Sequence, residues 1–222
     1  MGACEMNANP KTIDSENYYD HDQSDLLKLV RVPVDSVLEI GCATGNMLRH
    51  YVDAGATRVT GVEFVSTVGE IARQRCPEAL IFINDVDQVP LEELGSDYDL
   101  LIASFVLEHV TDPWHTLGRL ASIMRQGGQL VGSLPNVRHC SVTVPLLLKG
   151  KWEYKDKGIM DRTHYRFFSK STIEELLTAT GFTEIDIQPW VLPGKSAIAN
   201  NATLGLAIDH FAFAYRFSAI RG

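Results

Sequence analysis

The stretch Val37-Leu38-Glu39-Ile40-Gly41-Cys42-Ala43-Thr44-Gly45-Asn46 decides the fold class of this chain. An apolar run that contains Glu39 leads into a glycine-bearing loop, and a helix is predicted to begin at Asn46. A strand, a tight loop and a helix in this order hold a cofactor at the carboxyl end of the first strand of an α/β sheet. We therefore expect the residues Gly41, Ala43 and Gly45 to face a bound cofactor.

Acidic residues at the ends of three successive apolar runs indicate which cofactor. Glu39 stands just before the loop, Glu63 ends the next apolar run, and Asp85 ends the one after, with Asp87 as an alternative two residues on. Carboxylates would repel a pyrophosphate but suit a cofactor that carries a sulfonium and an ammonium group. The pattern therefore favours S-adenosylmethionine.

A nicotinamide-dependent dehydrogenase is the alternative on a similar sheet. Its glycine fingerprint would place glycine at positions 43 and 46, where this chain has Ala43 and Asn46. An acid at the end of the second strand serves either cofactor, whereas Asp85 at the end of the third favours the methyl donor.

Composition bounds the class of protein. The 222 residues suffice for one large domain, and 45% hydrophobic with 22% charged residues is usual for a globular enzyme. A formal charge of −8 argues against a nucleic-acid partner. No run of about 18 apolar residues is present, so no membrane span is expected. The four cysteines make no C-x-x-C pair, which predicts reduced thiols in a cytoplasmic protein.

Strand and helix patterns alternate along the chain, which predicts a doubly wound, mostly parallel sheet. We expect residues 1–16 to be a disordered lead-in and residues 17–222 to form one domain. The predicted strands are 36–40, 58–62, 80–83, 98–103, 129–134, 184–188 and 211–220. The predicted helices include 46–53, 66–75, a helix that begins at Asp112-Pro113 and ends at Gly127-Gly128, one that begins with a capping box at 171–174, and a segment at 198–210.

Residues 136–168 interrupt this alternation of strands and helices. A long irregular segment inside a compact domain is usually a lid or a binding loop, so we expect this insertion to shape an acceptor pocket. Its apolar run 144–148 is compatible with a pocket lining, a cover for the sheet or a homodimer contact.

With these features placed, residues 17–220 resemble the class I S-adenosylmethionine-dependent methyltransferases. The resemblance implies a seven-stranded Rossmann-like sheet whose last strand is antiparallel. It also implies that Glu63 binds the ribose and that Asn84-Asp85-Val86 contacts the adenine. Leu107-Glu108-His109-Val110 is similar to the fourth-strand motif of a large small-molecule branch.

A second motif narrows the resemblance. The segment 158–168, Gly-Ile-Met-Asp-Arg-Thr-His-Tyr-Arg-Phe-Phe, is similar to one in bacterial methyltransferases of glycan, polysaccharide and natural-product pathways. Two positions depart from the family. Ala43 replaces a usual glycine, and Phe105 stands where metal-assisted quinone O-methyltransferases carry an acid, so we expect no metal at Glu108-His109.

Two histidines are candidates for the general base. His164 lies between Arg162 and Arg166, whose charges would keep its imidazole neutral in an extended stretch. His109 follows the fourth strand, near the expected methyl group, and is the reserve candidate. Alternatively, His109 caps a loop, and Asp161 forms a structural ion-pair network with the two arginines.

The candidate cofactor-binding residues are Glu39, Gly41, Ala43, Gly45, Glu63, Asp85, Val86 and Ser104. The candidate substrate-binding residues are Arg138, His139, Arg162, Arg166 and Tyr19. Arg138 and His139 fit a solvated loop equally well, and Tyr19 fits ordinary helix packing.

We therefore expect a methyltransferase that acts on a small-molecule acceptor, with a hydroxyl of a sugar or secondary metabolite as the leading acceptor. Alternatives are a modified donor, a macromolecular substrate and a non-catalytic regulatory subunit that binds S-adenosylmethionine. The sequence 104–107, Ser-Phe-Val-Leu, lacks the Asn/Asp-Pro-Pro-aromatic motif of amino-directed nucleic-acid enzymes.

Overall fold

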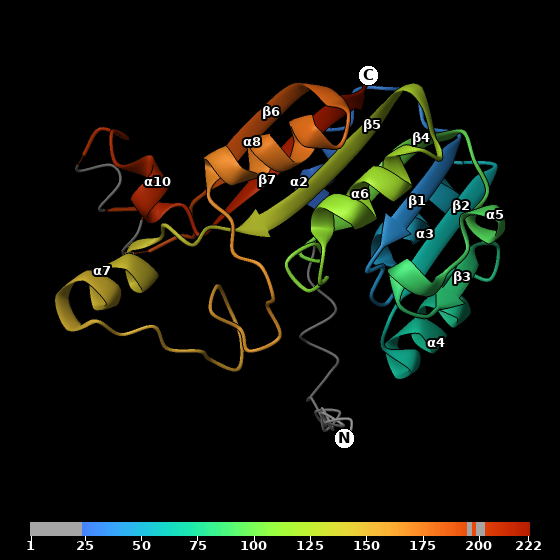
Figure 1. Cartoon of the computed structure of the whole chain (residues 1–222). Coiled ribbons are helices and arrows are strands. Elements are labelled where there is room, and N and C mark those ends of the chain that lie inside the picture. The colour runs from blue at the N-terminus through green and yellow to red at the C-terminus, as the bar shows by residue number, and fades with distance from the viewer. Residues whose placement is uncertain (1–23, 195–196, 199–202) are drawn as a thin grey trace, which may run out of the picture.

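A single sheet organises the computed structural model, which describes residues 24–194, 197–198 and 203–222 (Figure 1). Seven strands lie in the order β3-β2-β1-β4-β5-β7-β6. The last strand, β7, is antiparallel to both of its neighbours, and the other pairs are parallel. This arrangement confirms the predicted doubly wound sheet. The strands are β1 (Ser36–Ile40), β2 (Arg58–Glu63), β3 (Leu80–Ile83), β4 (Tyr98–Ser104), β5 (Met124–Pro135), β6 (Phe182–Trp190) and β7 (Ala214–Arg221).

Helices cover both faces of the sheet, and Figure 1 shows α6 and α8 in front of it. The helices are α2 (Ser24–Leu27), α3 (Asn46–Asp53), α4 (Ser66–Arg75), the 3-10 turn η1 (Val86–Gln88), α5 (Leu91–Leu94), α6 (Pro113–Ala121), α7 (Cys140–Lys149), α8 (Lys170–Ala179) and α10 (Ile208–Phe211). Among the residues that the structure describes, none of these helices has the length and apolar character needed to span a membrane.

Alternation along the strands explains the two layers. In β1, Leu38 and Ile40 pack with α6 and α8, whereas Val37 packs with α3 and α4 on the opposite face. Successive side chains of a strand point to opposite faces, so a strand covered on both sides is apolar throughout. Burial of each such side chain stabilises the fold by about 1.5–3 kcal/mol.

The predicted helix over 112–127 is too long. Helix α6 ends at Ala121, and Gly127-Gly128 lies within β5. Met124 continues the apolar spacing of the helix, but it pairs with Tyr98 of β4, and the register shifts after this pair. The glycines therefore fit a strand irregularity rather than a helix end. A Cβ on Gly128 would lie 2.9 Å from the Tyr98 carbonyl oxygen.

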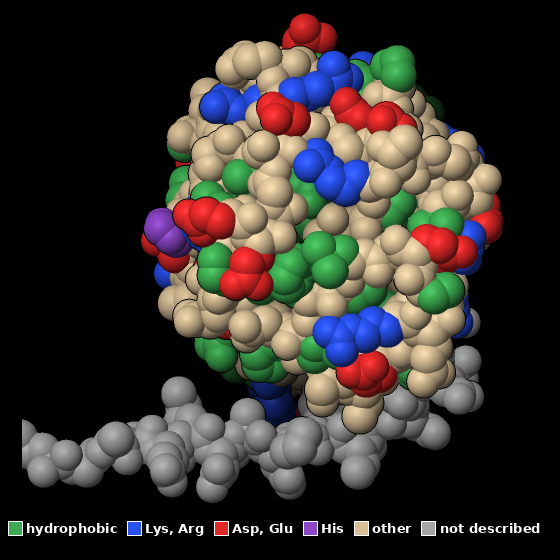
Figure 2. Space-filling model, turned by 90° about the vertical axis from the view of Figure 1, so that its right-hand side faces the viewer, with side chains coloured by type: hydrophobic (Ala, Val, Ile, Leu, Met, Phe, Trp, Pro, Cys, Tyr) green, Lys and Arg blue, Asp and Glu red, His purple; other side chains and the backbone are tan. Residues whose placement is uncertain are grey.

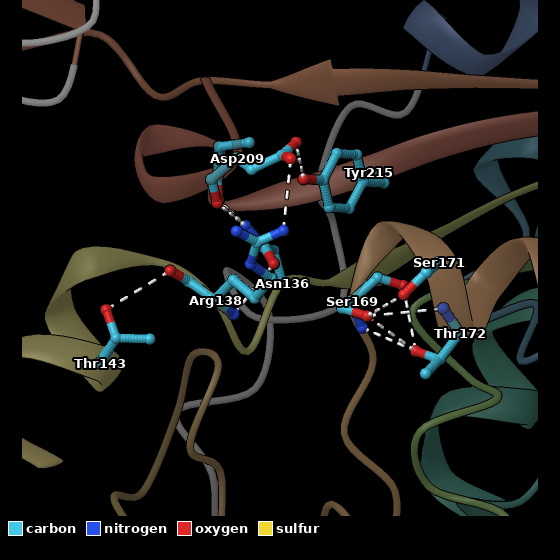
Figure 3. A network of polar contacts seen from close by, with 9 residues as sticks. Asn136, Arg138, Thr143, Ser169, Ser171, Thr172, Asp209 and Tyr215 are labelled. Atoms are coloured by element: carbon cyan, nitrogen blue, oxygen red, sulfur yellow. Dashed lines mark hydrogen bonds and ion pairs between the residues drawn. The ribbon is translucent and has the colours of Figure 1, made fainter. Parts of the chain in front are cut away.

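Other predicted boundaries also change. The last strand begins at Ala214 rather than at residue 211, because Phe211 ends α10. The N-cap of α8 is Ser169, whose hydroxyl and that of Thr172 form the capping box, so the box predicted at 171–174 is wrong (Figure 3). Its Oγ lies 3.1 Å from that of Ser171. Within 198–210, Ile198 and the residues from Ile208 onward are helical, whereas residues 203–207 form turns.

The insertion at 136–168 contains helix α7 and then an extended loop, which lies beyond the carboxyl end of β5 in Figure 1. Backbone hydrogen bonds attach this loop to the domain. The Val137 amide donates to the Phe168 carbonyl at 2.8 Å, and the Tyr165 amide donates to the Glu108 carbonyl at 2.8 Å. The insertion is thus held against the loop that follows β4.

The surface on the side of β3 and α5 carries both signs of charge. Figure 2 shows basic and acidic side chains next to one another on this face, with small apolar areas between them. Interspersed charges of this kind do not form the continuous basic stripe typical of nucleic-acid binding.

Candidate active site

The glycine loop between β1 and α3 has the geometry of a cofactor cradle. Gly41 and Gly45 have φ angles of +66° and +80°, which favour glycine. The Gly41 amide donates to the Val62 carbonyl of β2 at 2.8 Å, and the Gly45 amide donates to the Cys42 carbonyl at 2.8 Å. A Cβ on Gly41 would lie 3.0 Å from a methyl carbon of Val106. The loop after β1 and the loop after β4 therefore lie against each other.

Glu63 at the end of β2 supports this loop. Its Oε2 accepts from the Ala43 amide at 2.9 Å, and its Oε1 accepts from the Val65 amide at 2.8 Å. Burial raises the pKa of Glu63, and these amide hydrogen bonds oppose the rise. Each carboxylate oxygen has two lone pairs, so Glu63 can accept further hydrogen bonds from ribose hydroxyls. Ala43 adopts a φ of +48°, which alanine tolerates in place of the usual glycine at some cost in strain.

Glu39 is a buried carboxylate beside the same loop. Its side chain is 4% exposed, and its Oε2 has no hydrogen-bond partner among the residues that the structure describes. Burial and the nearby Glu63 raise the pKa of Glu39 well above its usual range. A buried carboxylate without a partner is costly unless a ligand supplies one. Two acids beside one loop fit a cationic cofactor.

Asp85 and Asp87, the two acids after β3, have different hydrogen-bond partners. Both oxygens of Asp87 accept from the Thr116 hydroxyl of α6, at 2.8 and 2.9 Å. Asp85 caps η1 by accepting from the Asp87 amide at 3.0 Å, and Val86 is buried behind it. Both acids therefore have structural partners, and the assignment of Asp85 to the adenine stays a prediction.

Ser104, at the end of β4, is buried, and its Oγ lies 2.6 Å from that of Ser133 in β5. The next residue, Phe105, has a φ of +51°, in the left-handed region that non-glycine residues rarely adopt. This turn directs the chain from β4 into the loop that carries Glu108 and His109.

The two candidate bases meet beyond this turn. The imidazole rings of His109 and His164 lie edge to face with centroids 4.7 Å apart. The carbonyl of Glu108 accepts from the amides of both Tyr165 and Arg166, which brings the two segments together. The structure therefore joins residues that are remote in sequence.

Burial favours the neutral form of both rings. It lowers the pKa of His109, with a further contribution from the adjacent His164, and it lowers the pKa of His164. The predicted cause, the charges of Arg162 and Arg166, is wrong. A turn closed by the His164 amide and the Asp161 carbonyl buries His164 and leaves the two arginines exposed.

The proposed ion-pair network around Asp161 is also absent among the described residues. Asp161 accepts from the Thr163 amide and hydroxyl at 2.9 and 2.7 Å. Arg162 instead lies 3.4 Å from the exposed Asp156. A substrate-binding role for Arg162 and Arg166 stays a prediction.

Arg138 and His139 have structural partners. Figure 3 shows the Arg138 guanidinium turned toward Asp209, at 3.4 Å, while the Tyr215 hydroxyl donates to the same carboxylate at 2.6 Å. His139 caps α7 by accepting from the Ser141 amide. Tyr19 lies outside the described residues.

Known proteins of similar sequence decide the family. A model of the methyltransferase domain family matches residues 16–187 of this chain. The chain belongs to this family and is an S-adenosylmethionine-dependent methyltransferase. Its cofactor is S-adenosylmethionine, as the acids beside the glycine loop predicted.

Relatives of this methyltransferase include O-methyltransferases. It is 32% identical over 111 residues to the malonyl-[acyl-carrier protein] O-methyltransferase of Anoxybacillus flavithermus, over 49% of this chain and 42% of the relative. It is 26% identical over 155 residues to the ubiquinone biosynthesis O-methyltransferase of Vibrio parahaemolyticus, over 68% and 65%. The chain thus spans less than two thirds of the length of both.

The solved structures share the fold of this methyltransferase. The S-adenosylmethionine dependent methyltransferase from Mesorhizobium loti has a TM-score of 0.62 at 19% identity, over 89% of this chain and 96% of that chain.

Glu108 was not among the candidate site residues predicted for this methyltransferase. The Glu108 side chain is 1% exposed, and burial raises its pKa to about 8. The carboxylate and the rings of His109 and His164 place one potential ligand atom each within 4.8 Å of the others. The only sign of this cluster in the sequence was that Glu108 stands next to His109. The position of His164 in the structure was needed to recognise it.

Proposed function

We propose that this methyltransferase methylates a hydroxyl of a small molecule, such as a sugar or a secondary metabolite. The contact between the rings of His109 and His164 is the observation that supports the proposal, because His109 lies on the loop that contacts the cofactor cradle. S-adenosylmethionine supplies the methyl group as an electrophilic carbon on a sulfonium.

The chain aligns the two reactants and handles one proton. The glycine loop with Glu39 and Glu63 holds the donor, and Asp85 positions its adenine. His164, with His109 in reserve, takes the hydroxyl proton as the acceptor oxygen attacks. Such positioning and general-base assistance are the main contributions that this displacement requires of a protein.

Aromatic side chains of the insertion form the acceptor side of the site. The ring of Phe167 contacts those of Trp152, Tyr154 and His164, with centroids 5.2, 6.2 and 6.3 Å apart. Aromatic faces pack well against sugar and other ring faces, so they favour a cyclic acceptor over a linear one. The two O-methyltransferase relatives support the choice of an oxygen acceptor.

The experiment uses methyl-labelled S-adenosylmethionine and an extract of the source cells, separated into small-molecule, protein and nucleic-acid fractions. We expect label in the small-molecule fraction only when the protein is present. Label in a macromolecular fraction would contradict the proposed acceptor class. Donor binding without any transfer would favour a regulatory subunit or a modified donor.

A further inference from the structure

Three potential metal ligands converge from the two segments that form the acceptor side of the site. A carboxylate oxygen of Glu108 and one ring nitrogen each of His109 and His164 all lie within 4.8 Å of one another. Glu108 and His109 come from the loop after β4, and His164 comes from the insertion. The backbone hydrogen bonds of the Glu108 carbonyl hold these segments in place.

Both imidazoles are oriented as metal-binding histidines are. The Nδ1 atom of His109 lies 3.2 Å from the Thr163 carbonyl oxygen, and that of His164 lies 3.0 Å from the Ile159 carbonyl oxygen. A carbonyl oxygen can only accept, so each Nδ1 carries the hydrogen and each Nε2 presents a lone pair. A backbone carbonyl on the second ring nitrogen is a common partner of metal-ligating histidines.

The Glu108 carboxylate supplies an independent observation. The side chain is 1% exposed, and neither oxygen has a hydrogen-bond partner among the described residues. Buried carboxylates are normally paired, hydrogen-bonded or bound to a metal, because an isolated one costs several kcal/mol or more. A cation between Glu108 and the two rings would satisfy both oxygens.

We propose that Glu108, His109 and His164 bind one divalent transition-metal ion, such as Zn²⁺. Metal-assisted quinone O-methyltransferases carry an acid at the position of Phe105. In this chain, His164 of the insertion supplies the third ligand instead. Two imidazoles and one carboxylate suit zinc or iron(II), whereas magnesium prefers an all-oxygen set. The sequence alone predicted no metal here because it does not place His164 beside Glu108.

The role of the ion in catalysis rests on the proposed function. Three protein ligands leave coordination positions open, where the acceptor hydroxyl binds and its pKa falls. The hydroxyl proton leaves to solvent. The acceptor oxygen then forms a bond to the methyl carbon while the carbon–sulfur bond of the donor breaks and sulfur keeps the electron pair. With the ion bound, His164 is a ligand rather than the proton acceptor.

Metal binding is measured on the full chain without donor or acceptor. The protein is dialysed against EDTA and titrated with CoCl₂, whose visible absorption reports ligation, and ZnCl₂ then displaces the cobalt. We expect one ion per chain, with Glu108→Gln and His164→Ala each weakening binding by more than about 100-fold, beyond the loss typical of an outer-shell change. His115→Ala, which alters an exposed histidine of α6, should bind as the wild type does.

Three results would overturn the proposal: no visible cobalt bands, binding that neither ligand variant weakens, or full turnover after EDTA treatment. Circular dichroism and calorimetry with S-adenosylmethionine establish that each variant folds. If Glu108→Gln does not fold, His164→Ala alone tests the metal site. Metal binding without methyl transfer would contradict the proposed function alone. Methyl transfer without metal binding would contradict the metal site alone.

Discussion

The ring of His164 lies edge to face against the ring of His109, with centroids 4.7 Å apart. This contact joins the loop after β4 to an insertion that begins after β5. The same loop contacts the cofactor cradle through Val106 and Gly41. The glycine loop and the histidine pair, the proposed donor and acceptor sides of the methyltransferase, therefore meet at one short loop.

Replacement of His164 tests the acceptor side. We expect His164→Ala to lower kcat by about 10²- to 10⁴-fold, the usual contribution of a general base, with little change in donor affinity. Turnover with labelled donor and calorimetry with S-adenosylmethionine measure the two quantities. Loss of His164 as a ligand of the proposed ion would also lower kcat, and the cobalt titration separates the two roles. His115→Ala is the matched control. A wild-type kcat in His164→Ala would remove this residue from the reaction.

The glycine loop tests the donor side. In Gly41→Arg, a side chain would enter at a φ of +66° and 3.0 Å from Val106, so we expect donor binding to be lost while the fold is retained. Gly55→Arg is the control, because Gly55 also has a positive φ, of +86°, but no atom lies within 4 Å of a Cβ there. Calorimetry with S-adenosylmethionine measures donor binding by both variants, and circular dichroism checks that both fold. Equal donor affinity in the two variants would contradict the site assignment.

Glu39 links donor binding to the pH dependence of stability. Burial and Glu63 raise the pKa of Glu39 in the folded protein. Folding therefore loses stability as the pH rises above the ordinary carboxyl pKa of about 4.3 and up to the folded value, by at most about 1.4 kcal/mol per pH unit. Glu39→Gln removes this loss, so its gain in free energy of unfolding over the wild type should increase with pH.

The same substitution removes a carboxylate that we propose to face the donor, so Glu39→Gln should also weaken S-adenosylmethionine binding. Urea denaturation at several pH values and calorimetry at neutral pH measure the two effects. A stability difference that is constant with pH would show that Glu39 is not held in its protonated form.

The structure and the sequence pattern place the N-cap of α8 at different residues. We expect Ser169→Ala to lower the free energy of unfolding by about 1 kcal/mol, because the Thr172 amide loses its acceptor. Ser171→Ala, at the N-cap that the sequence pattern suggested, should change stability by much less. Urea denaturation of both variants gives the comparison, and a larger effect at Ser171 would favour the sequence-based boundary.

Local patterns predicted most of the sheet. The apolar runs that end at Ile40, Glu63 and Ile83 form parallel strands, and they are apolar because side chains from both faces of the sheet pack into the core. The antiparallel last strand followed from the family resemblance. The end of α6 was missed because the apolar spacing continues to Met124, which pairs with Tyr98 of a distant strand.

The positions of the candidate donor residues could be predicted because they lie at strand ends, where a parallel sheet brings them together; their contact with the donor stays a prediction. The acceptor residues depend on contacts between remote segments. The hydrogen bonds from the Tyr165 and Arg166 amides to the Glu108 carbonyl have no sequence signature. Without them, the burial of Glu108 and the contact between His109 and His164 could not be inferred.

A crystal structure with S-adenosylhomocysteine would show whether the glycine loop and the histidine pair form one methyl-transfer site. We expect the homocysteine amino group to lie near Glu39 and the sulfur to face His109 and His164 across the loop that carries Val106. A sulfur atom that faces away from both histidines, with the rings outside the cofactor site, would contradict this expectation.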